Sequence, residues 1–317
     1  MRKKLTLNHS NGEIKLSEAF ENFIKKKQVS NLSPDTIQFY KRCYNPFKEF
    51  FGIDFPCCDF NEDNFFDYLG ILKNSKNLSP ITVNTHIRGL RAILYYFMEK
   101  EYTPYFKIKL IRCEKPIKET YTNSEIQKLI KKPDIKTDSF AQFRNWAMVC
   151  YLLATGNRLR TVRNLKIEDL DFEDMEIKLH HVKNKKAYII PMSKSLKEVL
   201  VEYLYHRQGE PHNYVFCNSY GKQMTKDTFV TAISQYNKSR GVEKTSTHLF
   251  RHTFAKNWVM NGGDIFRLQR MLGHSSLEMV KEYVSIYGND LKNEFDRFNA
   301  LDNHSQYFES KKTIKMK

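Results

Sequence analysis

Apolar side chains recur every three or four positions along most of the chain, a spacing typical of one buried face of an α-helix. The first such segment runs from Leu16 to about Lys27 and follows a short polar tail. Its apolar positions are Ala19, Phe20, Phe23 and Ile24. The pattern predicts a tail over residues 1–15 and then the start of a helical domain.

Two Ser-Pro pairs mark further helix starts, because serine caps a helix and proline suits its first turn. They are Ser33-Pro34 and Ser79-Pro80. The second pair opens a helix of about 20 residues. Its predicted buried stripe comprises Val83, Ile87, Leu90, Leu94 and Phe97. Another face carries Asn84, Arg88, Arg91 and Tyr95. That face either follows a duplex groove and contacts phosphates or is ordinary solvated surface.

Residues 102–118 interrupt the helical pattern with Pro104 and Pro116 and are rich in Lys and Arg. Such a segment is typical of an interdomain linker. The sequence therefore predicts a helical domain over 16–101, a basic linker over 102–118 and a second domain over 119–317.

The second domain begins with a helix capped at Thr122, and a longer apolar helix follows from Phe140 to about Ala154. Gly156 predicts the stop of that helix and a tight turn. Three arginines follow on a new short helix, namely Arg158, Arg160 and Arg163.

Strand signals are confined to the middle of this domain. Residues 175–182 alternate in polarity, 183–186 form a polar turn and 187–191 are a short β-branched run. This predicts a hairpin that presents Lys183, Lys185 and Lys186, after which helical patterns resume. They cover residues 194–207, 225–238, 247–261, 264–272 and 276–287. The predicted fold is mainly α, with a small β-hairpin or sheet in the C-terminal domain.

The charge balance points to a polyanionic partner. The 317 residues carry a formal net charge of +16, with a pI of about 9.4. Nucleic acid is the leading candidate, and the alternative is a solvated Lys-rich surface. Six cysteines without a CxxC pair indicate reduced thiols, and no apolar stretch of about 18 residues occurs. We therefore expect a cytoplasmic, nucleoid-associated protein without a membrane partner.

Several spaced motifs together carry a family resemblance. They are TGNRL at 155–159, a hairpin lysine, HLFRH at 248–252, LGHSS at 272–276, and Tyr283 nine residues after His274. In this order they resemble the tyrosine recombinase, or phage integrase, family. The resemblance implies a helical core-binding domain and a mixed α/β catalytic domain that form a C-shaped clamp around duplex DNA.

The resemblance also implies a role for each matched residue. Tyr283 would be the nucleophile, because a tyrosine oxygen can conserve the phosphodiester energy in a 3′-phosphotyrosine ester. Arg158 and Arg251 would stabilise the charge that develops on the attacked phosphate. His248 would assist proton transfer at the nucleophile or bind the phosphate, and His274 would donate a hydrogen bond to the phosphate.

The leaving 5′-oxygen needs a proton, which a lysine on the hairpin can supply. The resemblance assigns this role to Lys183, with Lys185 or Lys186 as alternatives if the turn is shifted. Arg160 and Arg163 are expected to contact phosphates or to be solvated. His252 is expected to pack or to be solvated on another side of its helix. The predicted DNA contacts are Asn84, Arg88, Arg91, Arg160 and Lys185.

One position departs from the family pattern. Thr161 stands where the family usually has an acidic residue, and a hydroxyl cannot offset charge. Another carboxylate is expected to support the site. Neither a metal nor a cofactor is expected, since the sequence has no GxxxxGK[ST] loop, no HExxH and no carboxylate cluster.

The resulting hypothesis is a site-specific recombinase that exchanges strands between specific duplex sites through a Holliday junction. A homo-tetramer on DNA is implied, with the segment after Tyr283 docking on a neighbouring protomer and with room for accessory proteins. A mobile-element integrase is preferred. The alternatives are a Xer-like resolvase or invertase, a type IB topoisomerase, and a non-catalytic DNA-binding protein.

Overall fold

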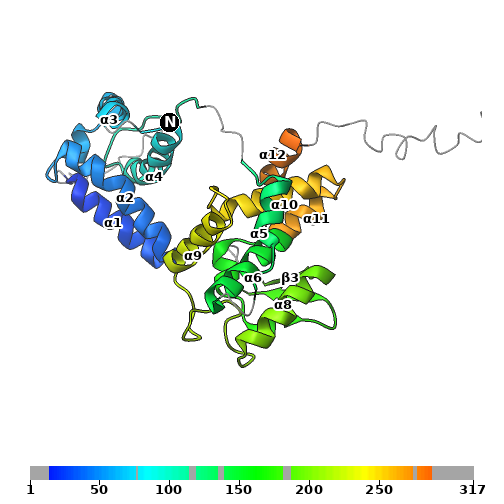
Figure 1. Ribbon diagram of the computed structural model, residues 1–317. Coiled ribbons are helices and arrows are strands. Elements are labelled where there is room, and N and C mark those ends of the chain that lie inside the picture. The colour runs from blue at the N-terminus through cyan, green and yellow to red at the C-terminus, as the bar shows by residue number, and fades with distance from the viewer. Residues whose placement is uncertain are drawn as a thin grey trace, which may run out of the picture. The chain divides into compact units, whose positions relative to one another are not determined.

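The computed structural model describes residues 14–75, 78–113, 119–134, 139–180, 187–273 and 277–287. The chain divides into two compact units, Met1–Pro116 and Ile117–Lys317. Figure 1 shows the first as a group of helices, and the second as a larger group of helices with a small sheet beside α8. Both units are mainly helical, so the predicted fold class is confirmed.

The first unit contains four α-helices and one short 3-10 helix. They are α1 (Leu16–Val29), α2 (Pro34–Phe51), η1 (Cys57–Asp59), α3 (Glu62–Ser75) and α4 (Pro80–Glu99). The two predicted Ser-Pro caps are confirmed, because the Ser33 and Ser79 hydroxyls accept hydrogen bonds from the amides of Thr36 and Thr82. Helix α3 was not predicted from the periodicity.

Helix α4 supplies the centre of the first core. Its predicted stripe from Val83 to Phe97 is at most 1% exposed. Aromatic rings from the other helices surround this stripe, as where Phe20 and Tyr44 stack with ring centroids 3.7 Å apart. The core of this unit is therefore built largely from aromatic side chains, each of which buries a large apolar area.

The segment after α4, predicted as the start of an interdomain linker, packs on the first unit. Phe106 and Ile108 join the core of this unit. The Asn84 amide donates to the Ile111 carbonyl and accepts from the Ile111 amide, both at 2.9 Å. The Tyr95 hydroxyl accepts from the Ile108 amide at 3.3 Å. In the structure the first compact unit therefore includes this segment and runs to Pro116.

The second unit contains most of the secondary structure. Its helices are α5 (Asn123–Ile130), α6 (Phe140–Thr155), α7 (Leu159–Arg163), η2 (Ile167–Asp169), α8 (Lys194–Arg207), α9 (Lys226–Ser239), α10 (Thr247–Met260), α11 (Ile265–Leu272) and α12 (Glu278–Tyr287). Helix α6 lies at the centre and packs against α5, α8, α9 and α10. Since nearly every side of α6 is covered, it is apolar around most of its circumference.

The sheet is antiparallel in the order β1 (Leu170–Asp171), β2 (Glu176–Leu179) and β3 (Tyr188–Pro191). Ile177 pairs with Ile190, and both are buried at 0–1% exposure. The predicted hairpin is thus confirmed, while the two-residue strand β1 was not predicted. None of the helices in the described ranges is long and apolar enough to cross a membrane.

Candidate active site

A tight turn after α6 positions the first predicted arginine. Gly156 ends α6 in the left-handed conformation at φ +60°, which favours glycine. A Cβ at this position would approach the Phe254 ring to 2.7 Å, so space also requires glycine. Two residues later Arg158 stands at the N-cap of α7. The turn formed by the TGNRL motif therefore fixes the position of Arg158 at the start of α7.

The two predicted arginines converge on one backbone carbonyl. Arg251, on α10, donates from Nη1 to the Gly156 carbonyl at 2.9 Å and from Nη2 to the Leu272 carbonyl at 2.7 Å. Arg158 donates from Nη1 to the Gly273 carbonyl at 3.2 Å and to Leu272 at 3.5 Å. The end of α11 thus holds both guanidinium groups side by side.

Burial and mutual repulsion act on Arg251. Its side chain is only 5% exposed. Burial, followed by the charge of Arg158, lowers the pKa of Arg251 to about 10. The group still carries its charge at neutral pH, so the site holds two adjacent positive charges suited to a phosphate.

His248 lies one helical turn before Arg251 on α10 and keeps an exposed side. Partial burial of the ring lowers the pKa of His248, and the charges of Arg251 and Arg158 lower it further. A neutral imidazole beside two guanidinium groups can donate a hydrogen bond to a phosphate oxygen without adding a third positive charge.

Tyr283, the predicted nucleophile, lies on α12 and is 2% exposed. Its ring packs in a small apolar cluster with Ala255, Leu268, Leu272 and Val280. Its hydroxyl lies 2.7 Å from Nδ1 of His252, and the two rings have centroids 5.7 Å apart. The hydroxyl is therefore enclosed and already in contact with an imidazole.

The contact of His252 was not expected, since the sequence patterns placed this side chain in packing or in solvent. A signal was present, because His248 and His252 are four residues apart and share one side of α10. If one histidine of such a pair reaches the site, the other lies near enough to reach it as well.

Tyr188 is a second site residue that the sequence patterns did not reveal. It opens β3, and its hydroxyl would lie 2.7 Å from a Cβ at Gly273. Burial raises the pKa of Tyr188, while the charges of Arg251 and Arg158 offset part of that rise. A phenol on β3 thus borders the paired arginines.

The remaining predicted groups lie outside the described residues. They are His274, Lys183 and its alternatives Lys185 and Lys186, and the part of the predicted docking segment after residue 287.

Thr161 follows Arg158 on α7 and is 8% exposed. Its amide donates to the Arg158 carbonyl at 2.9 Å. In the described part of the chain no carboxylate forms an ion pair with Arg158, so the expected substitute for the acidic residue is not seen at that arginine. The buried Asp169 instead contacts Nε2 of His180 at 3.0 Å.

The predicted DNA contacts differ in their exposure. Asn84 is 3% exposed and bonded to Ile111, so its placement on an outer face was wrong. Arg88 and Arg160 are exposed, and Arg91 is partly exposed. Arg163 donates from Nε to the Met224 carbonyl at 2.9 Å, which gives it a structural role.

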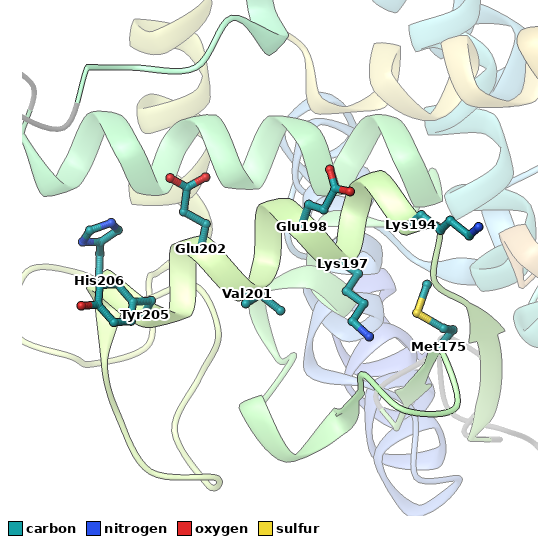
Figure 2. A pocket seen from close by; sticks show the side chains of 8 residues that line it. All are labelled: Met175, Lys194, Lys197, Glu198, Val201, Glu202, Tyr205 and His206. Carbon is teal, nitrogen blue, oxygen red and sulfur yellow. The ribbon is translucent and has the colours of Figure 1, made fainter.

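The described ranges contain no cluster of three or more His, Cys, Asp or Glu side chains arranged for a metal ion. A depression of about 920 Å³ lies along α8, and Figure 2 shows Lys197 and Glu198 on different sides of that helix. Its lining includes none of the predicted site residues. The candidate site lies elsewhere, at the paired arginines Arg158 and Arg251 and the nucleophile candidate Tyr283.

Comparison with known proteins identifies both units. Residues 119–289 match the phage integrase family, and residues 20–104 match the N-terminal SAM-like domain of phage integrases. The tyrosine recombinase XerD of Listeria monocytogenes is 27% identical over 296 residues, covering 89% of this chain and 99% of that protein. The tyrosine recombinase XerA of Pyrococcus furiosus is 28% identical, with coverage of 90% and 96%.

Solved structures share the fold. The Tn1549 transposon integrase in complex with circular intermediate DNA has a TM-score of 0.67 at 22% identity, covering 85% of this chain and 95% of that one. The XerH site-specific recombinase bound to palindromic difH has a TM-score of 0.68 at 22% identity, with coverage of 91% and 84%.

The family match covers more than half of the chain and includes every motif from TGNRL to Tyr283. This chain belongs to the phage integrase family of tyrosine recombinases, enzymes that cleave and rejoin DNA through a tyrosine nucleophile.

Proposed function

We propose that this chain is a site-specific recombinase that cuts one strand of a specific duplex with Tyr283 and rejoins it to a partner strand. The observation that carries this proposal is the meeting of Arg158 and Arg251 at the Leu272 carbonyl. Two guanidinium groups at one point form a receptor for a phosphodiester, and both stay charged while the transition state gains negative charge.

The described residues and the family resemblance together suggest a division of tasks within this receptor, in which the roles of Lys183 and His274 rest on the resemblance alone. Arg158 and Arg251 bind the non-bridging oxygens of the scissile phosphate, and His248 donates a hydrogen bond beside them. Tyr283 attacks phosphorus, and its phenolic oxygen replaces the 5′-oxygen to give a 3′-phosphotyrosine ester. Lys183 protonates the departing 5′-oxygen, and His274 adds a further hydrogen bond to the phosphate.

Duplex DNA is the substrate class. The net charge of +16 suits a polyanion, and exposed Arg88, Arg160 and partly exposed Arg91 are available for phosphates. Lys185 remains part of this proposed contact set. A homo-tetramer on DNA would bring two pairs of active sites to a Holliday junction, with the segment after Tyr283 linking the protomers.

A mobile-element integrase is our preferred biological role, and a Xer-like resolvase is the second candidate. The second candidate is favoured by the near full-length match to XerD, which covers 99% of that relative. Inverted repeats beside the gene that mark a movable segment would favour the integrase, whereas a single chromosomal site would favour the resolvase.

Covalent trapping tests the cleavage chemistry. DNA fragments that flank the gene are prepared with a nick that lets the cleaved piece escape, and are incubated with the protein. We expect a covalent protein–DNA band that Tyr283→Phe abolishes. Tyr220→Phe is the matched control, because Tyr220 is 87% exposed and should leave the band unchanged.

A type IB topoisomerase would also give this band. Assays on a plasmid with two copies of the trapped site separate the two activities, since only a recombinase produces joined partner strands. Failure of the wild-type protein to form any covalent band on site-containing DNA would instead favour a non-catalytic DNA-binding protein.

A further inference from the structure

Two histidines on α10 occupy different surroundings within the candidate site. His248 lies one helical turn before Arg251, on the side of the phosphate receptor, and burial followed by the charges of Arg251 and Arg158 lowers the pKa of its ring. His252 contacts the hydroxyl of Tyr283 at 2.7 Å through Nδ1. The chain thus provides one imidazole for the phosphate and another for the attacking oxygen.

A proton acceptor at Tyr283 meets a chemical need. A phenol has an ordinary pKa of about 10, so it is protonated at neutral pH and must lose its proton as it attacks phosphorus. Tyr283 is only 2% exposed, which keeps bulk water from serving as the acceptor. The 2.7 Å separation lies within the range required of a general base.

We propose that His252 is a catalytic residue that accepts the proton of the Tyr283 hydroxyl during cleavage. This assignment rests on the proposed function and gives His252 the proton-transfer task that the family resemblance implies for His248. With its own proton on Nε2, His252 presents the lone pair of Nδ1 to Tyr283.

The step balances in atoms and charge. The Tyr283 O–H bond breaks and its proton moves to Nδ1, forming an imidazolium. The phenolic oxygen forms a bond to phosphorus while the bond from phosphorus to the 5′-oxygen breaks. That oxygen receives a proton from the general acid on the opposite side. In rejoining, the imidazolium returns its proton to the departing Tyr283 oxygen, since the reverse reaction uses the same groups in exchanged roles.

The substitution His252→Asn isolates proton transfer from positioning. An asparagine amide can occupy the place of Nδ1 and keep a hydrogen bond to Tyr283, but it cannot take up a proton. We expect single-turnover cleavage of the nicked substrate to slow by about 100-fold or more, with DNA affinity unchanged. His212→Asn is the matched control, because His212 lies exposed in a loop. This variant should cleave the substrate at the wild-type rate.

Two measurements keep the outcome unambiguous. Added imidazole should restore part of the rate of His252→Ala, since the small base can enter the space left by the ring. A substrate with sulfur at the bridging 5′ position needs no proton on its leaving group. It should therefore rescue Lys183→Ala and leave His252→Asn slow.

Wild-type-like or faster cleavage by His252→Asn would overturn the assignment, and faster cleavage would show that His252 restrains Tyr283 instead. Rescue of His252→Asn by the sulfur substrate would also overturn it, because the defect would then lie at the leaving group. Absence of a covalent band with the wild-type protein would reject the proposed function itself, which is a distinct result.

Discussion

At the scale of single residues, Gly273 connects the arginine pair to the sheet. It ends α11 at φ +59°, and its carbonyl accepts from Arg158. A Cβ here would lie 2.7 Å from the Tyr188 hydroxyl oxygen and 3.2 Å from Cζ of that ring. Both the backbone conformation and the space around it therefore favour glycine.

The substitution Gly273→Ala should lower the free energy of unfolding by about 2 kcal/mol, from left-handed strain plus overpacking. In a Tyr188→Phe background the hydroxyl is gone, and the loss should fall to about 1 kcal/mol. Denaturant unfolding of the single and double variants measures this coupling. Gly221→Ala is the control, since φ is +75° but nothing lies within 4 Å of a Cβ. Equal losses in both backgrounds would contradict the proposed contact.

The order of the motifs, and the family resemblance that this order carries, are enough to predict part of this site. Arg158, Arg251 and Tyr283 follow from motif order, and the structure gathers them around α10, α11 and the end of α6. Tyr188 could not be predicted, because its partner Gly273 is distant in the chain and a strand residue carries no sign of what it faces. His252 was missed although its spacing from His248 is visible in the sequence.

At the scale of elements, hydrophobic periodicity located helices well and failed where a polar side chain turns inward. The stripe of α4 was predicted, but Asn84 was assigned to the outer face because its spacing places it on one helical face with Arg88 and Arg91. The structure buries it to satisfy the backbone of an irregular segment, which cannot bond within itself as a helix does. Helix α3 escaped prediction, and Asn61 and Asn64 cap its start by exchanging side-chain to backbone bonds.

The hydrogen bonds of Asn84 hold the segment of residues 102–113 on α4, and this role can be tested directly. Asn84→Ala leaves the Ile111 amide and carbonyl without their partner, and should lower stability by about 1–3 kcal/mol. The segment should also loosen, so trypsin should cleave after exposed Lys107 and Lys109 faster than in the wild-type chain. Arg88→Ala, an exposed change on the same helix, should leave both the stability and the cleavage rate unchanged. An unaltered proteolysis pattern for Asn84→Ala would mean that the apolar anchors Phe106 and Ile108 suffice.

At the scale of the whole molecule, the amino-acid composition predicted which class of partner the protein binds. It did not predict which residues contact that partner. A net charge of +16 indicates a polyanion without saying which arginines touch it. Exposure separates the candidates: Arg88 and Arg160 are exposed, whereas Arg163 is bonded to the Met224 carbonyl. Burial thus divides one basic composition into charges available to DNA and charges that support the fold.

That division predicts a particular salt dependence of DNA binding. Each phosphate contact releases condensed counterions, so the logarithm of the association constant falls with the logarithm of salt concentration, by about 0.9 per contact. Removing a contact with Arg88→Ala or Arg160→Ala should make the slope shallower by about that amount. Gln223→Ala, a neutral change at a side chain bonded to the Arg163 carbonyl, should leave the slope unchanged. Binding titrations on one duplex between 50 and 200 mM salt, about the range over which such losses are large, provide the measurement. If neither arginine substitution changes the salt dependence of binding, these two side chains do not contact phosphates. The DNA contacts would then lie in other parts of the chain.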